Sequence, residues 1–454
     1  MVIRHNLAAE ETLTTLNRNQ STLSKSLQKV SSGMKINGAE DDASGYAISE
    51  RMRTQIRSLD QATVNAQNGA SMMKVAEGAV SSTVDILRTL KQKAIDAAND
   101  TNTDDDRKII QKEFNQMIDQ IDDNAATTYN GKYLIDGSHN NRVIGAGTVL
   151  ANNNLSEPTL TAPRQLTAFE DRTGRNLGIQ QTDQITFSIV NNGRTWTRTY
   201  SVGTNTLTGL LNTDFRTDIE ADGWDVGLGF WDDRRYYGFD SSGVPVGPPD
   251  GSRTSFVAGS ATPGNTADAP QTADEPGLMY QIGGFTVAIT DRYGNIKRNA
   301  TNVLNDFHTV IYAQDDSEDN AFSFQIGTKS NQALKVGIMD MRAYALALRG
   351  EQGNTLNIST RNNANAAISV LENALNKALD QQTTLGAVQS RLNYTAQNLI
   401  TSSENTQNAE SVIRDADMAK EMTAYTKANV LTQAAQAMLS QANQNASNVI
   451  SLLR

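Results

Sequence analysis

The sequence contains no cysteine, which excludes disulfide bonds, thiolate metal sites and thiol nucleophiles. It has three histidines, His5, His139 and His308, and none has a second histidine at the spacing of a helix-borne zinc pair. We therefore expect neither a histidine-based metal site nor a serine–histidine triad, and no cofactor.

Long hydrophobic runs are also missing. No stretch of about 20 apolar residues is present, so a membrane-spanning helix is not expected. The first residues carry charge where a secretory signal peptide has an apolar run, so activity outside the cell requires another export route. The formal net charge of -10 argues against nucleic acid or an anionic membrane surface as a partner.

Proline and tryptophan are absent from both flanks of the chain. All eight prolines lie between Pro158 and Pro276, and all three tryptophans fall in the same interval. Residues 140–320 also hold 13 Lys and Arg against 22 Asp and Glu, which is most of the net charge. Because proline costs about 3 kcal/mol inside a helix, the flanks permit very long helices, and the middle is a different kind of structure.

Apolar residues in the N-terminal flank recur at the 3-4 spacing of a helical seam. This first seam comprises Leu13, Leu16, Leu23, Leu27, Val30 and Met34. After a break at residues 33–38, a second seam runs from Ile48 to Ala97, which predicts a helix about 75 Å long at 1.5 Å per residue. The polar run 99–106 predicts a turn with helix-capping side chains, followed by a shorter antiparallel helix.

The C-terminal flank has a similar layout. One seam runs from Leu371 to Leu399, and after a break the last one comprises Leu431, Ala435, Met438, Ala442, Val449 and Leu453. Periodicity alone fits an ordinary intramolecular bundle. However, residues 1–40 and 415–454 can pair only by closing a loop of several hundred residues, so we expect them to need neighbouring copies to become ordered.

These patterns predict a mainly α fold in which the two flanks form a long coiled-coil-like helical rod, with a β-rich inserted outer domain. Residues 184–190 and 194–202 alternate around Asn191-Asn-Gly193, which predicts a β-hairpin, and residues 280–290 predict another strand. The cluster of Trp224, Trp231, Tyr236 and Tyr237 fits a packed core better than a glycan-binding platform. Paired carboxylates such as Asp232-Asp233 fit a hydrated surface.

Five segments resemble parts of the bacterial flagellins. Asn37-Gly-Ala-Glu-Asp-Asp-Ala-Ser-Gly-Tyr-Ala-Ile48 is similar to the polar turn that opens the long helix of that family. The C-terminal hallmark is matched by Ser411-Val-Ile-Arg-Asp-Ala-Asp-Met-Ala-Lys-Glu-Met422 and Gln433-Ala-Ala-Gln-Ala-Met-Leu-Ser-Gln-Ala-Asn443. Phe322-Ser-Phe-Gln-Ile-Gly-Thr-Lys-Ser-Asn-Gln332 with Ile338-Met-Asp-Met341 resembles the family's hairpin.

The resemblance implies a structural, non-enzymatic subunit that self-assembles into the extracellular flagellar filament for motility. Residues 1–38 and 415–454 would form the inner tube, residues 39–139 and 321–414 the outer tube, and residues 140–320 a surface-exposed insert. It also implies unfolded export through the flagellar channel, with an export chaperone, the cap and the hook-junction proteins as partners.

The same resemblance allows one immune-recognition patch to be compared residue by residue. Flagellins that activate the toll-like receptor resemble Leu-Gln-Arg-Val-Arg-Glu-Leu-Ala where this chain has Leu87-Arg-Thr-Leu-Lys-Gln-Lys-Ala94. The patch comprises Leu87, Thr89, Lys91, Gln92 and Lys93, with Glu113 as an accessory position. Thr89 stands where the agonist flagellins have the key arginine, Gln92 where they have the glutamate and Lys93 where they have the second leucine. Because arginine anchors often dominate interfaces, we expect a weak agonist.

Two other functions fit part of the sequence. A hook–filament junction protein shares the paired terminal helices but does not propagate a filament. A surface enzyme or adhesin would use the insert, where we find no catalytic constellation.

Overall fold

The computed structural model describes residues 6–143, 148–152, 154–155, 165–191, 193–210, 238–239, 245–246, 254–258, 278, 281–315, 317–350 and 353–452. The chain divides into two compact units. The first unit comprises Met1–Gln67, Gln325–Ala333 and Leu392–Arg454, and the second comprises Asn68–Phe324 and Leu334–Arg391. Each unit therefore combines segments from both flanks of the sequence.

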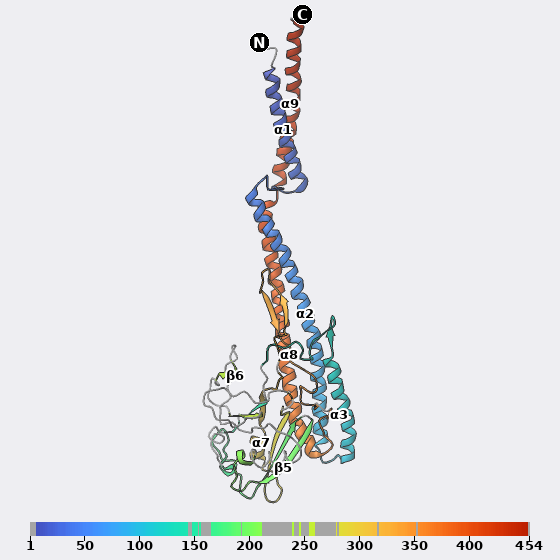
Figure 1. Ribbon diagram of the computed structural model, residues 1–454, viewed down its shortest axis with the longest axis vertical. Coiled ribbons are helices and arrows are strands. Elements are labelled where there is room, and N and C mark those ends of the chain that lie inside the picture. The colour runs from blue at the N-terminus through green and yellow to red at the C-terminus, as the bar shows by residue number, and fades with distance from the viewer. Residues whose placement is uncertain are drawn as a thin grey trace. The chain divides into compact units, whose positions relative to one another are not determined.

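Long helices account for most of both flanks, as Figure 1 shows. They are α1 (Leu7–Ser32), α2 (Ala43–Ala97), α3 (Asp104–Ala125), α8 (Arg361–Arg414) and α9 (Met418–Leu452). The predicted mainly α fold is confirmed, and the predicted break at residues 33–38 separates α1 from α2. Gly33 ends α1 in the left-handed conformation, with φ of 71°, and its N–H donates to the carbonyl of Lys29.

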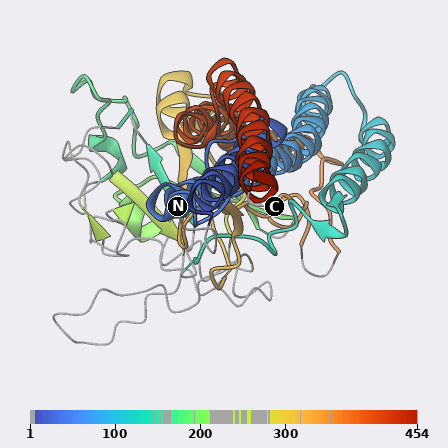
Figure 2. The same cartoon turned by 90° about the horizontal axis from the view of Figure 1, so that it is seen from above.

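The turn between α2 and α3 is capped as the sequence predicts. The Thr103 hydroxyl accepts a hydrogen bond from the backbone N–H of Asp106, whose carboxylate accepts the N–H of Thr103. Arg107 is buried and donates to the carbonyls of Ala97 at 2.7 Å and Asn99 at 2.9 Å, which satisfies the C-terminal end of α2. This chemistry folds α3 back beside α2 (Figures 1 and 2).

A continuous apolar core lies within the second unit along α2. Buried α2 residues include Met73, Ala76, Val80, Leu87, Leu90, Ala94 and Ala97, in agreement with the predicted second seam. α3 contributes the buried residues Phe114, Ile118 and Ile121, and α8 contributes Val370, Leu371, Ala374, Ala378 and Leu385. Alanine is frequent in these stripes, so the helix backbones can approach closely.

The middle of the chain contains short strands, as predicted. They are β1 (Thr128–Tyr129), β2 (Lys132–Tyr133), β3 (Thr148–Asn152), β4 (Gln184–Asn191), β5 (Arg194–Ser201), β6 (Gly238–Phe239), β7 (Pro245–Val246), β8 (Thr254–Ala258), β9 (Gly284–Thr290) and β10 (Phe307–Ile311). Short helical segments are η1 (Leu166–Ala168), α5 (Leu207–Gly209) and α7 (Arg298–Leu304). The strands form small antiparallel sheets, of which β5-β4-β9 and β10-β3-β8 have three strands.

The predicted hairpin is confirmed as β4 and β5, paired from Gln184↔Ser201 to Asn191↔Arg194. Gly193 in the turn has φ of 74°, which suits glycine. The predicted strand at residues 280–290 is β9, on the other side of β4. Alternate residues of these strands, including Ile185, Phe187, Phe285 and Val287, enter one buried cluster.

The hairpin before the C-terminal helices is also confirmed, because β11 (Phe322–Gln325) pairs with β12 (Ala333–Val336). The aromatic cluster of Trp224, Trp231, Tyr236 and Tyr237 and the pair Asp232-Asp233 lie outside the described residues.

Candidate functional site

The two terminal helices α1 and α9 lie side by side in the first unit and run antiparallel (Figure 1). Their register is marked by two hydrogen bonds from asparagine amides of α1 and its cap to backbone carbonyls of α9. Asn6 Nδ2 donates to the carbonyl of Ala442, and Asn19 Nδ2 donates to that of Leu431, both at 3.3 Å. The carbonyl of Leu431 lies within α9, so the Asn19 amide can reach it only where the two helix backbones come very close.

Small residues of α9 permit that approach. The buried residues on the described part of α9 are Ala428, Thr432 and Ala435. On α1 the facing stripe has a 3-4 spacing and is half-buried or buried at Thr12, Leu16, Asn19, Leu23, Ser26 and Val30. This contact is thin, because half of the α1 stripe is polar and the α9 stripe consists of short side chains.

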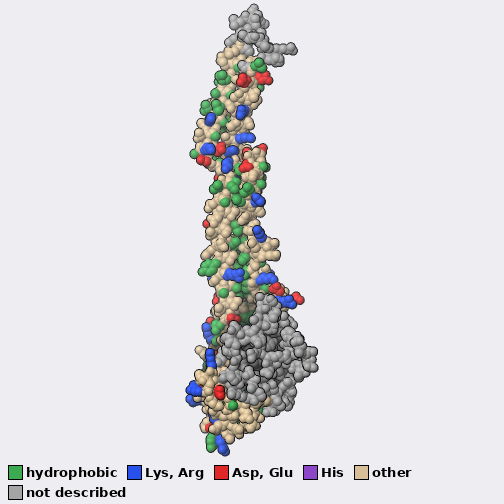
Figure 3. Space-filling view, turned by 90° about the vertical axis from the view of Figure 1, so that its left-hand side faces the viewer, with side chains coloured by type: hydrophobic (Ala, Val, Ile, Leu, Met, Phe, Trp, Pro, Cys, Tyr) green, Lys and Arg blue, Asp and Glu red, His purple; other side chains and the backbone are tan. Residues whose placement is uncertain are grey.

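Large apolar side chains of both helices stay exposed beside this contact. Leu27 is 51% exposed and Met438 is 61% exposed. The exposed set on the two helices is Leu7, Leu13, Leu27, Met418, Met422, Val430, Leu431 and Met438. Figure 3 shows hydrophobic side chains at the surface of these helices, interspersed with charged ones. A large set of exposed apolar residues marks an interaction surface.

The predicted seam residues therefore divide between two faces. Leu13, Leu27, Leu431 and Met438 are exposed, whereas Leu16, Leu23, Val30, Met34, Ala435 and Ala442 are half-buried or buried. Val449 lies within α9, and Leu453 lies outside the described residues.

The segments that connect the helices cross each other through backbone hydrogen bonds. The N–H of Lys35 donates to the carbonyl of Arg414 at 2.7 Å, and the N–H of Ala416 donates to the carbonyl of Gly33 at 2.9 Å. These hydrogen bonds hold the α1–α2 connection, residues 33–42, against the α8–α9 connection, residues 415–417. We call this pair of connections the joint.

Paired aspartates position the start of α2 within this joint. Asp42 Oδ1 accepts the N–H groups of Ser44 at 3.1 Å and Gly45 at 3.0 Å, as a capping residue does. Asp41 Oδ2 accepts the N–H of Asn37 at 3.0 Å. A side chain at Gly45 would meet Asp42 and, at 2.7 Å, Ile36, so this position favours glycine.

A buried arginine completes the joint, and sequence inspection did not identify it. Arg414 is 5% exposed, and its Nη1 lies 2.5 Å from Glu50 Oε1. Its guanidinium also lies 5.3 Å from the ring centroid of Tyr46. The hydrogen bond from Arg414 lowers the pKa of the Glu50 carboxyl below its ordinary value. A second pair, Arg53 Nε to Glu410 Oε1 at 2.9 Å, lies one turn further along α2 and α8.

The predicted immune-recognition patch lies in the second unit. Leu87 is fully buried, and the Thr89 hydroxyl donates to the backbone carbonyl of Asp85. Lys91 pairs with Glu372 at 3.2 Å, and Lys93 pairs with Glu113 at 2.6 Å. Gln92 is exposed. The carboxylate of Glu113 is therefore already engaged by a lysine of the same chain.

Comparison with known proteins decides the family. Residues 3–140 match the bacterial flagellin N-terminal helical region, and residues 368–453 match the bacterial flagellin C-terminal helical region. A flagellin of Clostridium tyrobutyricum is 36% identical over 98% of this chain and 99% of its own length. This chain belongs to the bacterial flagellin family.

A second flagellin agrees with this assignment, and a solved structure shows a weaker likeness. A flagellin of Bacillus subtilis is 29% identical over the full length of both chains. Among solved structures, flagellar hook associated protein-3 of Legionella pneumophila is 13% identical and covers 79% of this chain and 97% of its own, with a TM-score of 0.32.

Membership of the flagellin family makes this chain a structural subunit of the flagellar filament and not an enzyme. The flagellin segments quoted from the sequence now have positions in the fold. The Asn37–Ile48 segment forms the joint and the start of α2, and the Ser411–Met422 segment forms the end of α8 and the start of α9. Among the helices that the structure describes, none is both long and apolar enough to cross a membrane.

Proposed function

We propose that this flagellin polymerises by burying the outward apolar residues of α1 and α9 against neighbouring copies of itself. The observation that carries this proposal is the exposure of Leu13, Leu27, Leu431 and Met438 on helices whose mutual contact uses mostly small and polar side chains. Burying one leucine or methionine side chain contributes about 1.5–3 kcal/mol. Several such residues per copy supply the apolar area that the α1–α9 pair lacks.

In this proposal, residues 1–38 and 415–454 line the inner tube of the filament, and residues 39–139 and 321–414 form the outer tube. Residues 140–320 form the surface of the filament. The cap and the hook-junction proteins are the partners at the two ends, and each would engage the same outward residues of α1 and α9.

Polymerisation of point variants tests the role of the outward residues. Leu27→Gln and Met438→Gln change exposed positions, so the circular dichroism and thermal unfolding of the monomer should stay unchanged. The concentration of monomer left in equilibrium with filaments should rise at least about tenfold, since 1.4 kcal/mol corresponds to a factor of ten.

Ser24→Gln and Ser440→Gln are matched controls, because they place the same side chain at exposed polar positions of the same two helices. These controls should polymerise like the unmodified chain. Equal residual monomer for all four variants would contradict the proposed burial.

Export is proposed to proceed unfolded through the flagellar channel with an export chaperone. The absence of cysteine is consistent with this route, since no disulfide can lock the chain before passage. Expression in cells with an intact or an inactivated flagellar export apparatus tests it. The chain should reach the medium only in the first case, and its appearance in the medium of both would refute this route.

Weak activation of the toll-like receptor is the last part of the proposal. Thr89 cannot form the bidentate hydrogen bonds of an arginine, and Gln92 lacks the negative charge of the glutamate in agonist flagellins. The pairing of Glu113 with Lys93 further weakens any contact of that carboxylate with a receptor cation.

A further inference from the structure

Lys377 of α8 is an almost completely buried lysine within the second unit. Its side chain is 3% exposed, and Nζ donates to the carbonyl of Ala345 at 2.8 Å. Nζ also lies 5.7 Å from the ring centroid of Tyr312. Among the described residues, no carboxylate lies within the 4.0 Å of an ion pair with this amine. A lysine is rarely buried without an ion-pair partner.

Burial changes the protonation of this amine. It lowers the pKa of Lys377 to about 8, while Asp340 and Asp315 oppose the shift through their negative charge. The other charged side chains that line the same space are Asp136 and Arg342, and Arg342 is held by Asp340. At pH 7.5, about a quarter of an amine with that pKa is neutral, compared with about 0.1% of an ordinary lysine. Only the neutral amine is a nucleophile.

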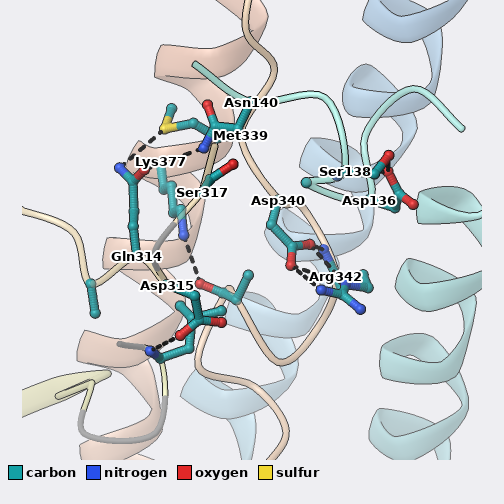
Figure 4. A pocket seen from close by; sticks show the side chains of 14 residues that line it. Asp136, Ser138, Asn140, Gln314, Asp315, Ser317, Met339, Asp340, Arg342 and Lys377 are labelled. Carbon is teal, nitrogen blue, oxygen red and sulfur yellow. Dashed lines mark hydrogen bonds and ion pairs between the residues drawn. The ribbon is translucent and has the colours of Figure 1, made fainter. Parts of the chain in front are cut away.

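A cavity of about 340 Å³ with both polar and apolar lining adjoins this amine (Figure 4). In this view Asp315 lies below the Lys377 amine and Asp340 to its right, and Ser138, Asn140 and Gln314 also line the cavity. The Asp315 carboxylate accepts the N–H of Leu278 at 2.8 Å, and that of Asp340 accepts hydrogen bonds from the backbone N–H, Nε and Nη2 of Arg342. The fixed carboxylates, hydroxyls and amides suit the hydroxyl groups of a small ligand, and Leu278, Ala313, Met339 and Ala345 form the apolar part of the lining.

We propose that Lys377 is a modification site that condenses with small hydroxyaldehydes in this cavity. The amine nitrogen attacks the aldehyde carbon, so that a C–N bond forms as the carbonyl electron pair moves to oxygen. Oxygen takes up a proton, nitrogen loses its protons, and the hydroxyl group leaves as water to give an imine. Amine and aldehyde thus yield imine and water, with no oxidant required.

Labelling of the full-length monomer with glycolaldehyde tests this proposal. Cyanoborohydride in the mixture converts each imine to a stable secondary amine, and peptide mass spectrometry reports the rate at each lysine. At pH 7.5, Lys377 should be labelled at least about tenfold faster than the exposed Lys74 and Lys420. Its rate should level off above about pH 8, whereas the rates of the two exposed lysines should keep rising to pH 10.

Three controls make the result decisive. In urea the difference between Lys377 and Lys74 should disappear, because the cavity is lost. Oxidised dextran, an aldehyde too large for the cavity, should label Lys74 and spare Lys377. Lys377→Arg confirms the assignment of the labelled peptide. Labelling of Lys377 that is no faster than that of Lys74 in the folded chain, or a rate that rises in parallel with it up to pH 10, overturns the proposal.

Discussion

Arg414 and Glu50 form an ion pair across 364 residues of sequence, with 2.5 Å between Nη1 and Oε1. The arginine is buried and the glutamate is half-exposed, so the pair lies at the edge of the joint where the two helix connections cross. Removing the acid would leave a buried guanidinium with fewer partners, which is more costly than losing an exposed ion pair.

Glu50→Gln should lower the melting temperature at neutral pH and weaken its dependence on acid. The hydrogen bond from Arg414 lowers the pKa of Glu50 from its ordinary 4.5 in the folded chain. The resulting stabilisation is therefore present above about pH 4.5 and is lost as the pH falls through the lower folded value. Thermal unfolding between about pH 6 and pH 3 measures both effects. Glu40→Gln, at an exposed position in the same connection, is the control and should melt like the unmodified chain.

The Lys377→Met variant should lack the increase in unfolding free energy that the unmodified chain shows as the pH rises above about 8. Because burial lowers the folded pKa of Lys377 to about 8, the unfolded chain binds more protons between about pH 8 and pH 10.5. The unfolding free energy of the unmodified chain should therefore rise with pH through this window, by up to about 3 kcal/mol from this group. Urea unfolding at pH 7.5 and pH 10 gives the difference between the two chains, and a parallel pH dependence would show that this amine is charged when folded.

Two glycines of α2 should respond in opposite ways to alanine. A side chain at Gly78 would meet nothing within 4 Å, so Gly78→Ala should stabilise the helix by up to about 1 kcal/mol. A side chain at Gly69 would lie 2.9 Å from the Phe324 ring, so Gly69→Ala must displace that ring and should be less stable than the unmodified chain. Denaturant unfolding ranks the three proteins, and equal stabilisation by both substitutions would show that the ring moves freely.

Restoring the receptor patch should convert a weak agonist into a stronger one. The variant Thr89→Arg, Gln92→Glu, Lys93→Leu supplies the missing arginine and glutamate and releases Glu113 from Lys93. We expect at least about a tenfold gain in potency in a receptor reporter assay, as for one strong interface anchor. Lys112→Ala, outside the patch on α3, serves as the control. An unmodified chain already as potent as a standard agonist flagellin would refute the weak-agonist proposal.

The sequence predicts those features that depend on neighbours along the chain. Spacing of Leu87, Leu90 and Ala94 reveals a buried helix face, and the polar run around Thr103 reveals a cap, because both effects act within a few turns. The partner of Arg414 is not predictable in this way, since Glu50 is distant in sequence and many acids are available.

The same limit applies to the terminal seams. Leu16 and Leu27 are equally apolar, but Leu16 is half-buried and Leu27 is exposed. Periodicity cannot specify which of them is buried, because that depends on the antiparallel register that the Asn6 and Asn19 hydrogen bonds mark. Nothing in the sequence around Lys377 indicates that this lysine is buried. That depends on how residues 313–315, 317 and 339–345 fold around α8.

Seeded growth followed by electron microscopy tests whether the terminal helices drive polymerisation. Purified full-length chain and a chain lacking residues 1–40 and 415–454 are each mixed with short filament fragments. We expect long tubular filaments from the full chain and none from the shortened one, because the exposed apolar residues of α1 and α9 are then missing. Elongation by the shortened chain, or no elongation by the full chain, would contradict the claim that these terminal helices drive polymerisation.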